Sequence, residues 1–342
     1  MFLNISVAAP DTKDMCREFS YYMMILQEIG IESCRSPHRS LHKAIKAVTL
    51  NLMILDNKYT MPYTVPSTAI DGRYRCTPLT FAALSQDLAA NHYSSTGIFT
   101  PQLQKRGLIW IISKQHFEIY DYPLWLDCLT LQTWAQPPKG LFCFRDFAYY
   151  YAAGGKKASL TEAFHDFDSA DRRSSEWSAA ALQQHQELCV RGSSCWIVFD
   201  TKTNHPVAPD DTIFGSLGFC EDHLEGRVFA KIALPEQWHY EVPVSPSLLD
   251  IDMNGHVNNL HYISWALSYM DADFCNGQAL KSLDTHFLLS AQYGDELCCR
   301  SHYIIEEQSC IHSILRTSDG SEVFRARSEW AAETSLSRPL QV

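Results

Sequence analysis

An apolar repeat of helical period begins just after Thr77. Phe81, Leu84 and Leu88 recur at intervals of three and four residues, which places them on one face of a helix. Thr77 is a residue type that caps helix N-termini, and Pro78 suits the first helical position because its missing N–H is not needed there. The pattern therefore predicts an amphipathic helix that starts at Pro78.

The segments after this helix are rich in β-branched and aromatic residues, which is typical of strands. They are the runs 108–113, 116–120, 128–135, 142–152 and 195–200. The same order then repeats: a helical repeat predicts a second helix over about residues 259–270, and strand-like runs follow it. These later runs are 286–290, 296–306, 310–317 and 322–331, with a hairpin turn at 318–321.

A helix followed by strands, twice over, is a weak internal duplication. It predicts an α+β chain in which each half packs a helix against an antiparallel sheet. We expect the following segments: a helical extension over 1–58, a first half over 59–210, a linker over 211–226, a second half over 227–335 and a tail over 336–342.

Two of these segments carry open alternatives. An insertion over about residues 161–192 has no counterpart in the second half, and it is either a surface excursion or a lid or carrier-docking element. The extension is either an appended helical segment or the product of a start codon read too early, with Met53 or Met61 as the true start.

Composition narrows the class of protein. Hydrophobic residues make up 46% of the chain and charged residues 20%, as in ordinary globular proteins. The formal net charge of −11 argues against a nucleic-acid binder, whose affinity comes largely from basic residues. No apolar run approaches the ~20 residues that span a bilayer. The N-terminal residues lack a basic region followed by an apolar one, so we expect no secretory signal. The 12 cysteines are scattered without metal-site spacing, so we expect no metal, and reduced thiols in a cytoplasmic protein.

The chemistry concentrates in one polar turn before the second helix. Asp252, Asn254 and His256 place a carboxylate, an amide and an imidazole where that helix begins, and free backbone N–H groups there can hold an oxyanion. A helix cap rich in Asn and Asp is the alternative interpretation of the same residues.

The wider string resembles a known family. DMNGHVNNLHYISW, residues 252–265, resembles the signature D-x-N-x-H-V-N-N-x-x-Y-x-x-W of the acyl-carrier-protein (acyl-ACP) thioesterases of plants and bacteria. Segments upstream are similar to that family's first-half motifs, in the same order, and the resemblance covers roughly residues 59–335. These segments are GLIW at 107–110, YPLW at 122–125, TW at 133–134, RDF at 145–147 and WIVFD at 196–200.

The resemblance implies a fold, a reaction and a set of residues. The fold would be a tandem double hotdog, with two long helices each wrapped by a curved antiparallel sheet. The reaction would be hydrolysis of fatty acyl-ACP to free fatty acid, with water as second substrate and no cofactor. Asp252, Asn254 and His256 match the family's catalytic residues.

Further residues follow from the same resemblance and from position. We expect the backbone N–H groups of residues 257–259 to form the oxyanion site, and Asn258 and Asn259 to contact substrate. Residues of the first half would line the acyl-chain tunnel, Trp110 and Trp134 among them.

One position departs from the family. A Glu belongs on the segment after the second helix, before a Gly-Asp pair, and the matching residue here is Ser290. A serine cannot act as a carboxylate base at neutral pH. Either Asp252 and His256 suffice, or Gln292, Asp295 or Glu296 contributes, or the enzyme is weak or inactive.

Partners and rival functions remain to be tested. The implied partner is the acyl carrier protein, which the basic residues Lys105, Arg106, Lys114 and Arg145 could meet, and a homodimer is one open assembly. The rivals are an acyl-CoA thioesterase, a non-hydrolytic acyl or carrier-protein binding module, and a hotdog hydratase. Hydratases resemble D-x-N-P-x-H, but Gly255 occupies the proline position here.

Overall fold

The computed structural model describes residues 54–153, 155–156, 187–223 and 229–336, all of which lie within one compact unit, Asn51–Val342. Most of the expected N-terminal extension, nearly all of the expected insertion and most of the expected tail fall outside the described residues.

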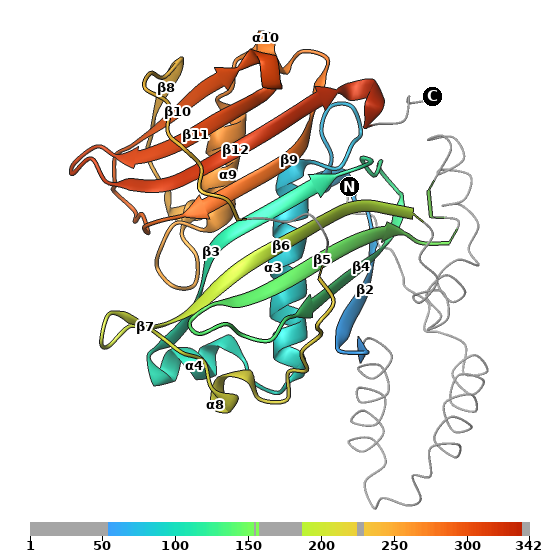
Figure 1. Ribbon diagram of the computed structural model, residues 1–342, viewed down its shortest axis with the longest axis vertical. Helices are drawn as coiled ribbons and strands as arrows, with labels where there is room; N and C mark the ends of the chain where they lie inside the picture. The colour runs from blue at the N-terminus through green and yellow to red at the C-terminus, as the bar shows by residue number, and fades with distance from the viewer. Residues whose placement is uncertain (1–53, 154, 157–186, 224–228, 337–342) are drawn as a thin grey trace, which may run out of the picture. The chain divides into compact units, whose positions relative to one another are not determined.

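The strands form one continuous antiparallel sheet (Figure 1). In chain order they are β1 (Ile54–Leu55), β2 (Lys58–Thr64), β3 (Leu108–Ile119), β4 (Cys128–Ala135), β5 (Cys143–Tyr151), β6 (Glu187–Asp200), β7 (His205–Val207), β8 (Tyr240–Val244), β9 (Gln278–Phe287), β10 (Leu297–Ile304), β11 (Ser309–Arg316) and β12 (Glu322–Ala332). Their order across the sheet is β1-β2-β4-β5-β6-β3-β9-β12-β11-β10-β8, with β7 paired to β6. Outward from the central β3–β9 pair, the first half continues as β6-β5-β4-β2 and the second half as β12-β11-β10-β8. The two series match strand for strand, so the halves are related by an approximate two-fold axis.

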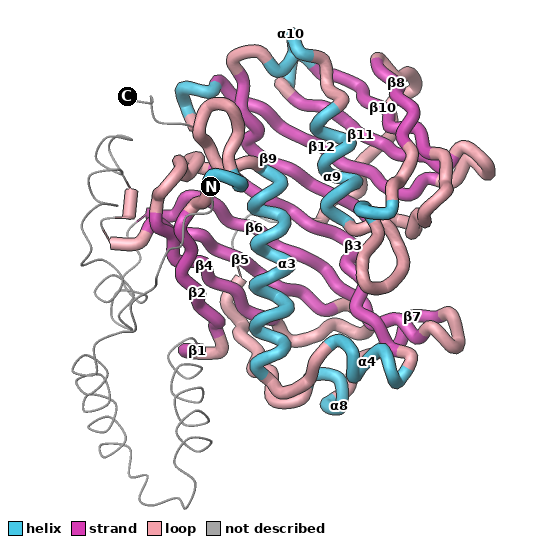
Figure 2. Tube along the Cα trace, turned by 180° about the vertical axis from the view of Figure 1, so that it is seen from behind, coloured by secondary structure: helices cyan, strands magenta, loops and turns pink. Residues whose placement is uncertain are grey.

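The two main helices cover the same face of this sheet (Figure 2). They are α3 (Pro78–Ser95) in the first half and α9 (Asn259–Ser268) in the second. Thr77 caps α3, as predicted, by accepting a hydrogen bond from the Thr80 N–H. The shorter helical segments are η1 (Ser67–Ala69), α4 (Thr100–Arg106), α8 (Asp211–Phe214), η2 (Leu248–Asp250), α10 (Ala272–Cys275), η3 (Ile305–Glu307) and η4 (Glu333–Ser335).

The main apolar core runs through both halves between the helices and the sheet. Phe81 of α3 and Phe147 of β5 belong to it in the first half, and Ile263 of α9 and Phe324 of β12 in the second. All four side chains are fully buried, so the halves are joined by packing as well as by the sheet.

Two tryptophans mark the duplication at atomic detail. The indole N–H of Trp196 on β6 donates to the Ser194 hydroxyl at 2.7 Å, and that of Trp330 on β12 donates to the Ser328 hydroxyl at 2.9 Å. These strands hold equivalent places in the two halves, so the predicted internal duplication and the α+β class are confirmed.

The prediction from the sequence missed two strands. β2 and β8 were not expected as strands, and each contains a proline, Pro62 and Pro243. Proline is tolerated near sheet edges, and β8 is an edge strand while only the two-residue β1 lies beyond β2.

Two further boundaries need correction. β9 spans Gln278–Phe287 rather than 286–290. β6 begins at Glu187, so residues 187–192, expected within the insertion, belong to a strand that pairs with both β5 and β3. Gly192 lies there because a Cβ would come within 2.6 Å of the Phe117 ring and 2.7 Å of the His116 carbonyl oxygen.

The connection between the halves ends on the face of the sheet opposite the helices, where residues 229–239 lie (Figure 1). Its first part binds the first half, where the Cys220 N–H donates to the Ala135 carbonyl. Its last part binds the second half, where Arg325 donates to the Ile232 carbonyl at 2.7 Å.

Candidate active site

The polar turn before α9 is organised by the carboxylate of Asp252. Oδ1 accepts the backbone N–H of Asn254 at 2.7 Å and that of His256 at 3.4 Å, while the Asp252 N–H donates to the His256 carbonyl at 2.8 Å. A side chain that bonds its own backbone two residues on is the usual way Asp fixes a turn. The carboxylate is therefore held in place before any substrate arrives.

Gly255 is required by the backbone of this turn. Its φ is +80°, in the left-handed region that glycine adopts without strain. Proline, whose φ is locked near −65°, cannot take this conformation. The geometry thus separates this turn from the proline-containing hydratase pattern.

The amide of Asn254 lies against the carboxylate, but the imidazole of His256 does not. Asn254 Nδ2 is 3.5 Å from Asp252 Oδ2, at the outer limit of a hydrogen bond. Among the described residues no side chain bonds the His256 ring, which is half-buried. The predicted trio thus shares one turn, with Asp252 and Asn254 in contact and the imidazole unengaged.

The predicted oxyanion donors are mostly occupied. The N–H of Val257 donates to the Ala291 carbonyl at 2.9 Å, and that of Asn258 donates to the Asp250 carbonyl at 2.8 Å. The expectation was therefore wrong for these two groups, because both are used to tie the turn to neighbouring segments. The Asn259 N–H, the first of α9, has no acceptor within the described part of the chain, and it is the remaining candidate for an oxyanion donor.

Asn258 is the N-cap of α9. Its Oδ1 accepts the Leu260 N–H at 3.0 Å, so the capping interpretation holds for this residue. Its predicted contact with substrate is left to the Nδ2 group. The Asn259 side chain is half-buried.

A residue of the first half completes the turn. Gln104 of α4 donates from Nε2 to Asn254 Oδ1 at 3.0 Å. Nothing in the sequence pointed to this residue, because the two positions are 150 residues apart and Gln104 lies in no motif.

A carboxylate–imidazole pair flanks the turn and was also missed. His261 Nδ1, in the first turn of α9, is 3.0 Å from Asp250 Oδ1. The other carboxylate oxygen of Asp250 accepts the Ser247 N–H at 2.6 Å. The pair lies next to the N-terminus of α9, so the site contains two imidazoles, those of His256 and His261.

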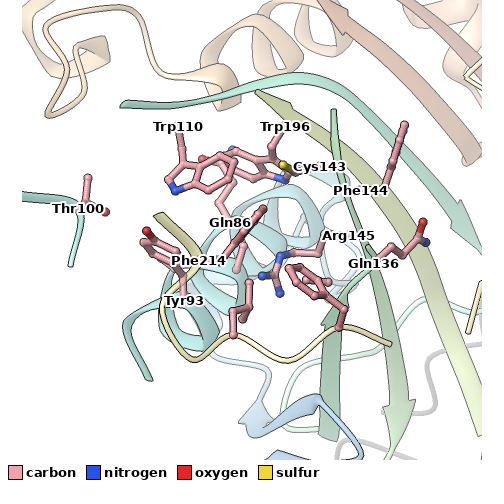
Figure 3. A pocket seen from close by; sticks show the side chains of 15 residues that line it. Gln86, Tyr93, Thr100, Trp110, Gln136, Cys143, Phe144, Arg145, Trp196 and Phe214 are labelled. Atoms are coloured by element: carbon pink, nitrogen blue, oxygen red, sulfur yellow. The ribbon is translucent and has the colours of Figure 1, made fainter. Parts of the chain in front are cut away.

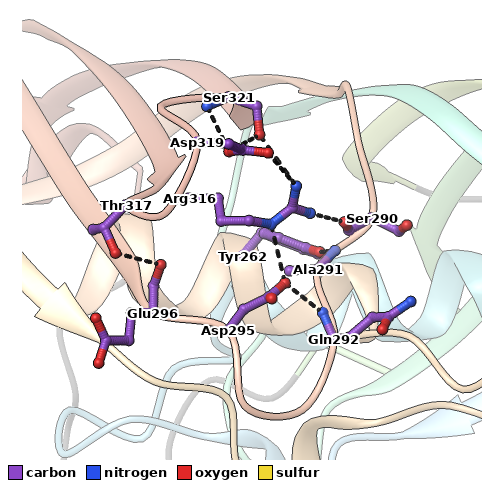
Figure 4. A network of polar contacts seen from close by, with 10 residues as sticks. All are labelled: Tyr262, Ser290, Ala291, Gln292, Asp295, Glu296, Arg316, Thr317, Asp319 and Ser321. Atoms are coloured by element: carbon purple, nitrogen blue, oxygen red, sulfur yellow. Dashed lines mark hydrogen bonds and ion pairs between the residues drawn. The ribbon is translucent and has the colours of Figure 1, made fainter.

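Ser290 lies on a loop that Arg316 holds (Figure 4). Arg316 donates to the Ser290 carbonyl at 2.6 Å and to Asp295 Oδ2 at 3.2 Å. The Ser290 side chain is exposed, and Gln292 and Glu296 are exposed too. Asp295 is engaged by Arg316, so it is poorly suited to replace the missing family carboxylate.

This loop is joined through Ala291 both to the polar turn and to α9. The Ala291 carbonyl accepts from Val257, and the Ala291 N–H donates to the Tyr262 hydroxyl at 2.8 Å. These two hydrogen bonds of Ala291 fix the position of the neighbouring Ser290 relative to the polar turn.

A cavity of about 120 Å³ lies in the first half (Figure 3). Its wall is mostly aromatic and small apolar side chains with a few polar groups. The lining residues are Gln86, Ala89, Ala90, Tyr93, Thr100, Trp110, Ala135, Gln136, Cys143, Phe144, Arg145, Trp196, Phe214, Leu217 and Phe219. No residue of the polar turn lines it, but α4 links the two, since Thr100 contributes to the wall and Gln104 contacts Asn254.

The two tryptophans predicted to touch the acyl chain lie on different sides. Trp110 lines the cavity. Trp134 does not: its indole N–H donates to the Asp222 carbonyl at 2.8 Å, and Lys58 lies over its ring. Its strand neighbour Ala135 faces the cavity instead, as the alternation of side chains along a strand requires.

From the sequence we expected Arg145 to be a surface residue that could meet the carrier protein. The structure buries it in the cavity wall. Its guanidinium donates to His92 Nδ1 at 3.0 Å and to Thr133 at 3.2 Å. Burial lowers the pKa of Arg145 to about 10, and burial with the charge of Arg145 lowers the pKa of His92 to about 3. The arginine is therefore charged and the histidine neutral at pH 7.

The described residues were also compared with what a metal site and a membrane span require. No group of three His, Cys, Asp or Glu side chains there is arranged to hold a metal ion. None of the helices in this part of the chain has the length and apolar character to cross a membrane.

Comparison with known proteins identifies the family. The model of the acyl-ACP thioesterase N-terminal domain matches residues 56–179, and that of the C-terminal domain matches residues 236–332. An oleoyl-acyl carrier protein thioesterase of Coriandrum sativum is 25% identical over 247 residues, which are 70% of this chain and 61% of the relative. A palmitoyl-acyl carrier protein thioesterase of Arabidopsis thaliana is 24% identical over 275 residues, 73% of this chain and 58% of the relative. This chain thus spans about six-tenths of the length of these two relatives.

Solved structures show the same fold. The 12:0-ACP thioesterase of Umbellularia californica superposes with a TM-score of 0.66 at 20% identity, covering 81% of this chain and 98% of that one. An acyl-ACP thioesterase of Bacteroides thetaiotaomicron gives a TM-score of 0.63 at 18% identity with the same coverage. The double hotdog predicted from the resemblance is confirmed, and the chain belongs to the acyl-ACP thioesterase family.

Proposed function

We propose that this protein hydrolyses the thioester of fatty acyl-ACP and releases free fatty acid. The observation that carries the proposal is the pre-organised turn at the start of α9, where a carboxylate and an amide lie in contact beside a helix N–H that has no acceptor among the described residues. Family membership supports the same reaction, because the relatives named above are acyl-ACP thioesterases.

The chemistry needs an activated water, a stabilised oxyanion and a leaving thiolate. The free imidazole of His256 takes a proton as water attacks the carbonyl carbon, and it returns the proton to the departing sulfur. The developing oxyanion receives hydrogen bonds from the Asn259 N–H and the second proton of Asn254 Nδ2. Asp252 holds the turn and balances the imidazolium charge. The C–S bond breaks, and the products are a carboxylic acid and a thiol.

The cavity supports an acyl substrate. Its aromatic wall suits a hydrocarbon chain. Because Thr100 lines it and Gln104, one turn along α4, reaches the polar turn, an acyl chain held there points its carboxyl end toward Asp252.

An exposed apolar surface around the turn supports a protein-borne substrate over a CoA ester. This apolar rim consists of Leu248, Leu249, Met253, Leu288, Leu289 and Tyr293, which are 71%, 92%, 75%, 45%, 52% and 62% exposed. The residues lie on two segments that are joined where the Val257 N–H donates to the Ala291 carbonyl, and exposed apolar surface of this kind marks interaction sites. We infer that the carrier protein docks on the apolar rim.

One observation favours a second candidate. The family carboxylate is replaced by Ser290, whose side chain is exposed and uncharged. A chain that binds acyl-ACP without hydrolysing it would fit this loss.

A hydrolysis assay with purified protein separates the candidates. We expect thiol release from medium- or long-chain acyl-ACP, slower release from the matching acyl-CoA, and loss of both in Asp252→Asn. Asn keeps the Oδ1 acceptor for the two backbone N–H groups, so the variant should fold. Equal rates for the wild type and Asp252→Asn would exclude catalysis at this turn; binding of acyl-ACP without turnover would favour the second candidate.

A further inference from the structure

The amide of Asn254 can take only one orientation with all its contacts satisfied. A carboxylate only accepts hydrogen bonds, so the group that faces Asp252 Oδ2 must be the NH2 of Asn254, at 3.5 Å. The Asn254 oxygen then faces α4, and a donor must meet it there. Gln104 Nε2 is that donor, at 3.0 Å.

We propose that Gln104 is a positioning residue for the reaction: from the opposite half of the molecule, its NH2 group holds the Asn254 amide in the orientation that the Asp252 carboxylate selects. This inference rests on the proposed function. Without Gln104 only the weak contact to Asp252 would hold the amide in place, since 3.5 Å is at the limit of a hydrogen bond. With it, the second Nδ2 proton is directed consistently at the place where the oxyanion forms.

The surroundings make this role specific to Gln104. Its helix is anchored on both sides of it: the Leu103 side chain is buried, and Arg106 donates to the Thr212 carbonyl at 3.0 Å. Gln104 itself is half-buried, and among the described residues its side chain bonds Asn254 alone. The amide contact therefore reports on the site and contributes little to holding α4.

The helix offers a matched control. Gln102, two residues earlier, accepts the Phe99 N–H at 2.8 Å and so closes the start of α4. Gln102→Met removes a hydrogen bond of the same helix without touching the active site. Any effect that comes from loosening α4 should appear in Gln102→Met at least as strongly as in Gln104→Met.

Steady-state hydrolysis of acyl-ACP by two variants tests the role. We expect Gln104→Met to lower kcat about tenfold, the factor that corresponds to losing one oriented hydrogen bond, with KM within about twofold of the wild type. Gln102→Met should leave kcat unchanged. A Gln104→Met kcat equal to that of the wild type, or an equal fall in Gln102→Met, would overturn the proposal.

Gln104→Glu gives a readout that a purely structural role would not move. Above the ordinary carboxyl pKa of about 4.3 the introduced group is ionised and can only accept, so the Asn254 amide turns over and its oxygen faces Asp252. Below that pKa the protonated carboxyl donates again and restores the orientation. The rate of Gln104→Glu relative to the wild type should therefore rise as the pH falls toward 4.5, and a ratio that does not change with pH contradicts the proposal.

Side-chain amide NMR separates failure of this proposal from failure of the proposed function. In protein labelled with 15N at Asn and Gln, the Asn254 NH2 signals of Gln104→Glu should shift with pH as the introduced carboxyl titrates. In Gln104→Met the same NH2 protons should exchange faster with water. Signals that ignore both substitutions overturn the contact even if the wild type hydrolyses acyl-ACP. Signals that respond in a protein without thioesterase activity keep the contact and reject the reaction.

Discussion

His116 of β3 and Asp284 of β9 face each other across the strand pair that joins the two halves, with His116 Nδ1 2.8 Å from Asp284 Oδ1. The other ring nitrogen is 3.3 Å from Glu118, which in turn is bound by Arg191. Burial alone would lower the pKa of His116, but hydrogen bonds and charges of Asp284 and Glu118 outweigh it and raise the pKa. The junction of the halves thus favours the charged form of the imidazole.

We expect the stability of the protein to depend on pH through this junction. Because the folded pKa of His116 is raised, its contribution is fully present below the unfolded pKa of about 6.5 and is lost as the pH rises through the folded value. His116→Gln should cost about 2 kcal/mol in free energy of unfolding at pH 6 and less at pH 9. Urea unfolding between pH 5.5 and 9 measures this. Asp284→Asn should show the same pH dependence, and a constant loss at every pH would contradict the assignment.

The same junction explains what the sequence could not predict about the fold. The helices α3 and α9 and most strands were predicted because each has an apolar face that recurs with a clear period. β9 was misplaced because its centre is polar: Ser282, Asp284 and His286 pair with polar partners on β3 instead of showing a simple apolar pattern. The domain boundaries and the cytoplasmic localisation stay predictions.

The candidate site was predicted only where it is local in sequence. Asp252, Asn254 and His256 share one turn, so a short motif locates them. Gln104 reaches that turn from α4, and no periodicity or cap signals a contact between halves. Trp134 was expected at the cavity and faces away from it, because β4 presents alternate residues to opposite sides.

We expect Trp110 and Trp134 to respond differently to the same substitution. Trp110→Leu enlarges the cavity and should shift the preferred acyl chain toward greater length. Trp134→Leu should leave the preference unchanged and cost stability, by about 2–4 kcal/mol for a buried indole. A panel of acyl-ACP chain lengths, with thermal unfolding of each variant, checks both. An altered preference in Trp134→Leu would show that the acyl chain does not use this cavity as inferred.

We expect the apolar rim to recognise the carrier protein. Leu249→Ser combined with Leu289→Ser should raise KM for acyl-ACP about tenfold or more, since buried aliphatic side chains each contribute about 1.5–3 kcal/mol. KM for acyl-CoA should change little. Ile305→Ser, at a residue 64% exposed in η3, removes an apolar side chain outside the rim and serves as control. Equal changes for the two substrates would place the rim's role in acyl-chain entry.

The two imidazoles beside the turn should differ in their effect on the rate. His256 has an unengaged ring, whereas His261 is held by Asp250 at 3.0 Å. We expect His256→Ala to lower kcat by about 100-fold or more and His261→Ala by less than about tenfold. Single-turnover rates with acyl-ACP, with unfolding curves as control, decide the order. The reverse order would assign the proton transfer to the Asp250–His261 pair.

Ser290→Glu tests whether the missing family carboxylate limits the enzyme. The Ser290 side chain is exposed, so a larger one fits, and the backbone there is tied to Val257 and Tyr262 through Ala291. An added carboxylate can accept a proton from the attacking water, and we expect kcat to rise about tenfold or more. Arg316, which already donates to the Ser290 carbonyl, could instead capture the new carboxylate as an ion pair. Ser290→Gln has nearly the same shape without the charge. A rise in Glu but not in Gln assigns the gain to the carboxylate, and equal rates in all three proteins mean that Asp252 and His256 are sufficient without it.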